Sequence, residues 1–259
     1  MRSQKRFVVV SVLGIIAVVA GLSLLTWRMV TESGISGSVP WNRGERQAYE
    51  QSATGGSSES RTLGELTPQV DLNGIEGVFV RGGWDIRIYE TDDPDLSVSV
   101  TERHADRVTV GRRGEVLTLM VAENTNYAGA RFEAAVGLPS FSELEIVGLG
   151  NIEIRGLDID ELDVTVEGAA NLIARDTTIE TLLLSLDGAG NIDFSESPAT
   201  NATVDIAGLA NVAILMAGGV LDGRIEGLGR VTYSGNVSEQ RIETDGGFLR
   251  AVNVEQTDQ

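Results

Sequence analysis

Apolar and polar residues alternate along the second half of the chain, and the alternation is written in units of about twenty residues. The stretch EIVGLGNIEIRG, residues 145–156, is followed at steps of twenty by TVEGAANLIARD, SLDGAGNIDFSE and DIAGLANVAILM. In each unit aliphatic residues stand two positions before the first glycine and four positions after it, with polar residues between them. A period of two is typical of a strand with one buried face, and no unit contains a helical period long enough for a helix.

A fixed period near twenty residues that contains only strands and turns predicts an all-β fold, a β-helix or solenoid of roughly 20-residue coils. Equivalent positions of successive coils would then lie about 4.8 Å apart, which is the spacing between strands. Columns of Ile, Leu and Val would fill the core, and this explains how a chain with 5% aromatic residues builds one. A leucine-rich repeat has a similar length, but it requires Leu two residues after its Asn.

The glycine and asparagine of each unit form two predicted columns. Glycine lets the backbone turn with a positive φ, and asparagine tolerates the left-handed region better than most residues. Stacked asparagine amides can also form a hydrogen-bonded ladder. A row of sugar or metal ligands is the alternative interpretation, and the turn geometry makes it the weaker one. The predicted turn and ladder residues are Gly148, Asn151, Gly168, Asn171, Gly188, Asn191, Gly208, Asn211 and Gly227.

The first part of the chain has a different pattern. Residues 7–27 form an apolar run without any charge, preceded by three basic residues and followed by Arg28. This run is long enough to cross a bilayer as a helix, and the charge asymmetry places the N-terminus in the cytoplasm. A cleaved signal peptide is the alternative, but the run is longer than such peptides usually have. The predicted segments are a cytoplasmic N-terminus (1–6), a transmembrane signal anchor (7–30), a flexible Gly/Ser-rich linker (31–67), the β-helix domain (68–254) and a tail (255–259).

Charge narrows the range of partners. Of the 38 acidic and 20 basic residues only 5 and 7 lie in residues 1–67, so residues 68–259 carry a formal charge of −20. So negative a domain repels phosphate backbones, and we expect no nucleic-acid partner. The chain contains no cysteine, which excludes disulfides and thiolate metal sites.

Several short motifs follow one another in an order that matches a known family. They are Gly74-Ile75, the segment from Gly82 to Ile88, Leu117 to Leu119, Leu138-Pro139 to Leu144, and then the glycine–asparagine units. In this order the chain, over about residues 70–252, resembles the head GIN domain family, described as putative auto-transporter adhesins. The resemblance implies an exported, right-handed β-helix-like domain and supplies no catalytic residues. The chain departs from the family in Phe141, which stands where the family usually has Leu.

Candidate chemistry is sparse. His104 is the only histidine and has no triad-like neighbours, and we expect neither catalytic residues, a cofactor nor a metal. Glu167 and Asp187 would share a column at a separation near that of a retaining glycosidase pair, although both are expected to face water. Outward-facing carboxylates define a predicted acidic surface stripe, which consists of Glu153, Glu167, Asp187, Asp193 and Glu226.

Together these patterns predict a membrane-anchored, exported domain that acts as a non-enzymatic surface or envelope binding module of the adhesin type. Its predicted location is the cell membrane, with a single span and the domain on the periplasmic or outer side. The predicted partners are the membrane, through the N-terminal helix, and an envelope glycan or protein. Two alternatives remain at this stage: a polysaccharide-acting β-helix enzyme and a membrane-linked signalling sensor.

Overall fold

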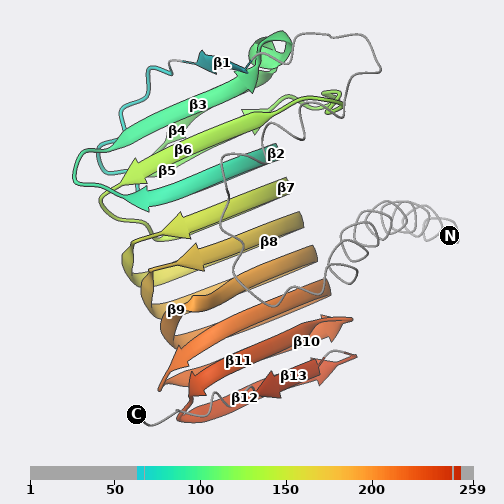
Figure 1. Ribbon diagram of the computed structural model, residues 1–259. Coiled ribbons are helices and arrows are strands. Elements are labelled where there is room, and N and C mark those ends of the chain that lie inside the picture. Colours follow the sequence, from blue (N-terminus) through green and yellow to red (C-terminus); the bar gives the residue numbers. More distant parts are fainter. Residues whose placement is uncertain (1–62, 67, 247, 252–259) are drawn as a thin grey trace, which may run out of the picture. The chain divides into compact units, whose positions relative to one another are not determined.

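The computed structural model describes residues 63–66, 68–246 and 248–251, and nearly all of its elements are strands (Figure 1). The chain divides into two units, 1–59 and 60–259, and all described residues belong to the second. The elements in chain order are β1 (Leu63–Leu66), β2 (Gly77–Glu90), β3 (Asp95–Thr101), the 3₁₀ helix η1 (Glu102–Arg107), β4 (Val108–Arg113), β5 (Val116–Val121), β6 (Phe132–Leu138), β7 (Glu143–Arg155), β8 (Asp158–Arg175), β9 (Thr178–Ala217), β10 (Val220–Gly227), β11 (Arg230–Asn236), β12 (Glu239–Asp245) and β13 (Phe248–Ala251).

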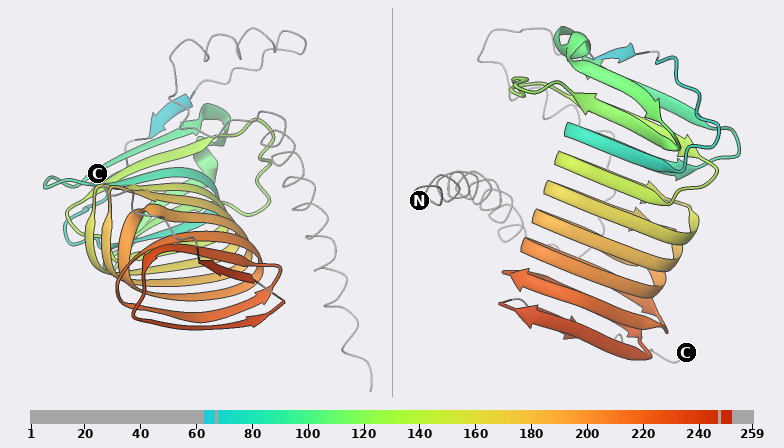
Figure 2. Two further views of the ribbon diagram at one scale, coloured as in Figure 1. Left: turned by 60° about the horizontal axis from the view of Figure 1, so that its bottom comes forward. Right: turned by 180° about the vertical axis from the view of Figure 1, so that it is seen from behind.

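The strands form one mixed sheet with two ends. Its main path runs β1-β3-β6-β2-β7-β8-β9-β10-β12. The pairs β2–β7, β7–β8, β8–β9 and β9–β10 are parallel, whereas β1–β3, β3–β6 and β4–β5 are antiparallel. From β7 onwards the strands of this path follow one another in sequence order, and the sheet curves strongly around its inner face (Figures 1 and 2). Strands β1 and β12 end the path without pairing with each other, so the sheet stays open.

Two long strands split the sheet into branches. One edge of β2 pairs with β5 through residues 77–81 and with β6 through residues 85–90. One edge of β9 likewise pairs with β10 through residues 202–208 and with β11 through residues 211–217. Each strand has a glycine with positive φ where its partner changes: Gly82 lies between the two pairings of β2, and Gly208 is the last residue of β9 that pairs with β10.

The predicted fold class is therefore wrong. A solenoid of uniform 20-residue coils requires parallel pairing throughout, but the described strands form one open, mixed sheet whose first part contains antiparallel pairs. The physical reason lies in residues 77–138, which do not have the twenty-residue period: β3 pairs antiparallel with β6 and β4 with β5, while β2 pairs parallel with β5 and β6. Within the repeated units the strands also run through the turn glycine, so they join a single sheet: β9 alone is 40 residues long.

Buried side chains fill the inner face of this sheet. Alternating positions of β7 and β8 are almost completely buried, for example Ile152 and Ile154 on β7 and Leu172 and Ala174 on β8. Aromatic rings enter the core mainly in the first part of the sheet, where the Phe132 ring lies 5.7 Å from Trp84, 5.8 Å from Tyr127 and 6.0 Å from His104, measured between centroids. Aliphatic ladders and this aromatic cluster thus stabilise different parts of one core.

The predicted anchor (7–30) and linker (31–67) lie outside the described residues, apart from β1. In the part of the chain that is described, no helix is long and apolar enough to span a membrane. The transmembrane anchor and the N-terminal boundaries stay sequence predictions.

Candidate binding surface

The repeated glycines form a continuous corner in the sheet. Gly148 pairs with Gly168 and Gly168 with Gly188, and Gly208 pairs with Gly227. Their φ values lie between 102° and 138°, a backbone region that residues with a side chain rarely adopt. A Cβ added to Gly168, Gly188 or Gly208 would also collide with the carbonyl oxygen of the preceding glycine in the column. The corner therefore requires glycine both for its dihedral angles and for the close approach of adjacent strands.

Two further members of this column were missed in the sequence. Gly82 pairs with Gly148, and an added Cβ at Gly246 would lie 2.8 Å from the Gly227 carbonyl oxygen. A signal for Gly82 was present: Val80 stands two positions before it, Asp85 three after it and Ile86 four after it, as in the later units. The separation of 66 positions between Gly82 and Gly148 hides this relation. Gly246 has no comparable flanking pattern.

Two outward columns follow the corner, one and three positions after each glycine, and we call them together the corner face. The first column contains Gly83, Leu149, Ala169, Ala189, Leu209 and Leu228, and the second contains Asp85, Asn151, Asn171, Asn191, Asn211 and Arg230. Tyr127 belongs to the face as well, because its ring fills the space that a side chain at Gly83 would occupy. Partial burial there raises the pKa of the Tyr127 hydroxyl.

Exposed apolar side chains are concentrated on this face. Leu149 is 53% exposed, Leu209 40%, Leu228 72% and Tyr127 40%. Phe248, which is 67% exposed, pairs with Arg230 and extends the second column. Among the described residues the only other large hydrophobic side chain with comparable exposure is Leu63 on β1. Large apolar groups grouped in one line are a feature of binding surfaces more than of ordinary solvated ones.

The predicted asparagines lie together in the second column and are only partly bonded to one another. Asn151 Nδ2 donates to Asp85 Oδ1 at 2.6 Å, and Asn191 Nδ2 donates to Asn171 Oδ1 at 3.2 Å. Each amide has further donor and acceptor capacity that points outward. Over these six levels the column runs from the carboxylate of Asp85 to the guanidinium of Arg230, and beyond them it continues to Glu133 and Phe248.

The predicted acidic stripe is divided among several columns. Glu167 and Asp187 are paired neighbours on β8 and β9, directly before the corner glycines, and Glu226 ends that column. Glu153 and Asp193 lie on the other side of the corner. Glu167 and Asp187 are exposed and have no hydrogen-bond or ion-pair partner in the described part of the chain, whereas Glu226 lies 2.6 Å from Arg224. The five residues are not one site.

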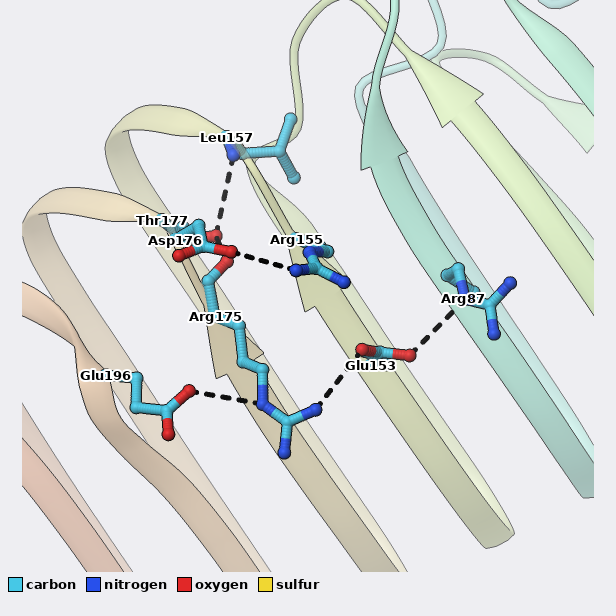
Figure 3. Close-up of polar contacts among 8 residues, drawn as sticks. All are labelled: Arg87, Glu153, Arg155, Leu157, Arg175, Asp176, Thr177 and Glu196. Atoms are coloured by element: carbon cyan, nitrogen blue, oxygen red, sulfur yellow. Dashed lines mark hydrogen bonds and ion pairs between the residues drawn. The ribbon is translucent and has the colours of Figure 1, made fainter. Parts of the chain in front are cut away.

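Glu153 belongs to a ladder of ion pairs on the outer surface, shown in Figure 3. Its carboxylate lies 3.3 Å from Arg87 Nε and 3.5 Å from Arg175 Nη1, and Arg175 Nε lies 3.2 Å from Glu196. Arg155 forms a separate pair with Asp176 at 3.2 Å. Opposite charges alternate across neighbouring strands here, so these side chains satisfy one another. We interpret the ladder as structural.

The described residues include no group of three or more His, Asp and Glu side chains that could hold a metal ion. His104 lies on η1, where its Nε2 accepts a hydrogen bond from Arg103 Nε at 3.1 Å. A small hollow on the other side of the corner is lined by Glu143, Leu144, Glu145, Asp163 and Thr165. What the chain offers around the corner is a long exposed face of apolar and amide groups.

Comparisons with known proteins agree with the resemblance seen in the sequence. A putative adhesin from Bacteroides fragilis NCTC 9343 is similar with a TM-score of 0.56 and 14% identity, over 75% of this chain and 98% of that chain. A putative lipid binding protein from Parabacteroides distasonis ATCC 8503 (TM-score 0.45, 18% identity, 74% and 96% covered) and a putative adhesin from Parabacteroides merdae ATCC 43184 (TM-score 0.42, 16% identity, 74% and 95% covered) are also similar. The search of curated proteins found no match.

The first of these similarities shows a shared fold. The family model described as "putative auto-transporter adhesin, head GIN domain" matches residues 74–237, which is more than half of the chain. The family predicted from the order of the sequence motifs is thereby confirmed: the chain belongs to the head GIN domain family.

Proposed function

We propose that the domain is a non-enzymatic, adhesin-like binding module of the cell surface or envelope, and that it binds through the corner face. One observation carries the proposal: five of the six exposed large apolar side chains among the described residues lie on or next to the corner face, beside a row of exposed or half-exposed amides. Apolar groups contribute contact area, and amides contribute hydrogen bonds and therefore specificity. The adhesin names of the family and of the similar structures support the same role.

The ligand that fits this face is extended, because the face is a line. Six strand levels from Gly83 to Leu228 span about 24 Å at about 4.8 Å per strand. An envelope glycan chain or an extended protein segment could contact several levels at once. Weak contacts repeated along such a line add up to useful affinity.

The carboxylate pair does not favour catalysis. A glycosidase needs two carboxyl groups with different roles, which their surroundings must set. Glu167 and Asp187 are both exposed and no described side chain orients either of them. We therefore propose binding without hydrolysis. Purified chain should release no reducing sugar from envelope polysaccharides, and release that is lost in Glu167→Gln would contradict this part of the proposal.

Location outside the cytoplasm is part of the proposal and follows the adhesin-like relatives. The membrane is the partner predicted from residues 7–30, and that prediction is tested separately from binding. Full-length chain that carbonate washing strips from the membrane fraction would contradict it. Binding along the corner face does not depend on the result.

The direct test is binding to native envelope. Envelope fragments from the source organism are incubated with the full-length chain, sedimented, and the bound fraction is measured. Leu149→Ser combined with Leu209→Ser should reduce binding at least about tenfold, since both side chains are exposed on the face. Leu63→Ser is the matched control, because Leu63 is 37% exposed on β1, away from the face. Equal binding by the double variant and the control would overturn the proposal.

A further inference from the structure

We propose that the corner face also binds a second copy of this chain, in an antiparallel dimer with two-fold symmetry. The inference rests on the proposed function, because it names a partner for the same face. The observation behind it is the order of side chains in the two columns. Read from one end to the other, the face is complementary to its own reversed copy.

Charge fixes the register of this dimer. Over the six levels of the corner face the second column runs from Asp85 to Arg230, with only amides between them; beyond these two residues it continues to Glu133 on β6 and to Phe248 on β13. Both end residues are exposed, and Arg230 has no side-chain partner within the described part of the chain. A two-fold axis in the plane of the contact, perpendicular to the columns, reverses the order of the strands. Asp85 of one copy then faces Arg230 of the other, and the symmetry repeats the pair at the opposite end.

The apolar column fits in the same register. Tyr127 above Gly83 faces Leu228 of the second copy, Leu149 faces Leu209, and Ala169 faces Ala189. Large groups therefore meet large groups near the ends, and small groups meet in the middle, where the backbones can approach. The amides of Asn171 and Asn191 face each other across the axis and can exchange hydrogen bonds.

A neighbouring register is less favourable. If the axis passed through the level of Ala189, Asp85 would face Phe248 and Arg230 would face Asn151. Arg230 would then be covered opposite a neutral amide, and Asp85 would keep only its hydrogen bond from Asn151. A shift the other way would pair Arg230 with Glu133 on β6 but would place Leu149 opposite Ala189. Charge and side-chain size together therefore favour the register with Asp85 opposite Arg230.

The dimer should be weak and sensitive to salt. Two columns form a narrow strip, smaller than a standard protein interface. Glu167 and Asp187 lie just beyond the corner and approach their counterparts in the second copy, so like charges oppose the contact. We expect association in the micromolar range or weaker, detectable as a mass that rises with concentration.

Charge reversal tests the inference with the full-length chain, by sedimentation equilibrium over a series of concentrations. Asp85→Arg alone and Arg230→Asp alone each place like charges together at both ends of the dimer. Each should raise the dissociation constant at least about tenfold. A mixture of the two variants restores both pairs, since one copy carries two arginines and the other two aspartates. The mixture should therefore associate about as tightly as the unaltered chain.

Glu180→Arg is the control for net charge, because Glu180 is exposed on β9 but lies outside the corner face. The dissociation constant of this variant should stay within about threefold of that of the unaltered chain. Melting curves of each variant show that it is folded; if Asp85→Arg is not, Asp85→Asn with Arg230→Asp gives the same comparison with one charge removed.

Two results would overturn the inference. One is an unaltered chain that stays monomeric up to millimolar concentration, and the other is association that neither reversal weakens. Failure of the dimer is distinguishable from failure of the proposed function, because envelope binding is measured independently by sedimentation with fragments. A monomeric chain that still binds envelope through Leu149 and Leu209 would refute only the dimer.

Discussion

In residues 143–236 each strand pairs with a partner about twenty residues away, whereas in residues 77–138 the partners lie at varied distances and in both directions. Strand β7 pairs with β8, and β8 with β9, so that glycine meets glycine and asparagine meets asparagine. In the first region β2 pairs with β5, β6 and β7, and β3 and β4 pair antiparallel with β6 and β5. In the second region the strands therefore pair at one repeated offset of about twenty residues, whereas in the first region each pair of strands has its own offset and direction.

The two regions also differ in how their cores are filled. The repeated region relies on stacked aliphatic side chains and on a backbone corner that only glycine can make. The first region places four rings, those of Trp84, His104, Tyr127 and Phe132, around one point. Substitutions should therefore act through backbone geometry in the repeated region and through ring packing in the first.

The largest effect is expected at the corner. In Gly188→Ala the added Cβ would collide with the Gly168 carbonyl oxygen, at a φ of 136°. Because this obstacle is backbone, the strands must separate, and we expect a loss of about 3 kcal/mol or more in the free energy of unfolding. The measurement is urea denaturation followed by circular dichroism.

Gly218→Ala is the matched control. Its φ of 114° is also positive, but a Cβ there meets nothing within 4 Å. It should show only the dihedral strain, about 1 kcal/mol. Equal losses for the two variants would mean that strain alone, and not the close approach of strands, makes glycine necessary.

The second effect concerns alternation on β9. Ile192 is 1% exposed and pairs with Leu172, so Ile192→Asp would bury a carboxylate without a partner. We expect a loss of several kcal/mol. Asp193→Ala, one residue later, should cost no more than about 1 kcal/mol, the value of its hydrogen bond from the Ser195 amide. Equal decreases in the melting temperatures of the two variants would contradict the assignment of inner and outer faces.

These positions show what the sequence could predict. The equal spacing of glycine, asparagine and aliphatic residues predicts which residues of β7, β8 and β9 become neighbours, because a fixed period implies a fixed offset between strands. The fold as a whole was predicted wrongly, because the twenty-residue period begins only near residue 143. The alternation of apolar and polar residues in residues 77–138 does not show which strands pair. Antiparallel pairing of β3 with β6 depends on chain geometry that no local pattern encodes.

The candidate surface was only partly predictable for a similar reason. The asparagine column was visible, but its two charged ends were not recognised as parts of the same column. Asp85 joins it through a pairing across 66 residues, and Tyr127 reaches it from a loop. Leu149, Leu209 and Leu228 occur in the repeat, yet their exposure becomes evident only when the corner turns them outward. The acidic stripe was grouped by charge alone, and the structure separates its members.

The third prediction compares two members of the acidic stripe, Glu153 and Glu167, which lie in different surroundings. Glu153 bridges Arg87 and Arg175 and its side chain is 29% exposed, whereas Glu167 has no described partner. Glu153→Gln should lower stability by about 1 kcal/mol at low salt and by less at high salt. Glu167→Gln should leave stability unchanged or raise it slightly, since Asp187 is a like-charged neighbour. Thermal melts at low and high salt compare the two, and a larger loss in Glu167→Gln would contradict the ladder.

The fourth prediction concerns a polar contact of the first region. The Tyr89 hydroxyl donates to Asp95 Oδ2 at 2.6 Å, and this bond raises the pKa of Tyr89 to about 12. The folded pKa lies above the unfolded value of 10.0, so the stabilisation is complete below pH 10 and is lost as the pH rises towards 12.

The free energy of unfolding, measured by denaturation at pH 8 and at pH 11, should therefore fall with pH in the unaltered chain. It should fall less in Tyr89→Phe. The pair is exposed, and the difference between the two proteins should be well below that expected for Ile192→Asp. An identical pH dependence in both would show that the bond does not couple to folding.

The smallest change in stability is expected at Ser197, which has no hydrogen-bond partner in the described part of the chain, although the equivalent residue one repeat earlier, Thr177, has two. Thr177 Oγ1 donates to the Arg175 carbonyl at 3.0 Å and accepts from the Leu157 amide at 3.5 Å. Ser197, twenty residues later, is fully buried, and its Oγ has no hydrogen-bond partner among the described residues. A buried hydroxyl without a partner costs free energy, so Ser197→Ala should leave stability unchanged or raise it by about 1 kcal/mol. Thr177→Val keeps the shape but loses two hydrogen bonds, and it should lower stability by about 1 kcal/mol or more. Differential scanning calorimetry of the two variants resolves the comparison, and a clear loss in Ser197→Ala would show that this hydroxyl is bonded in solution as its counterpart is.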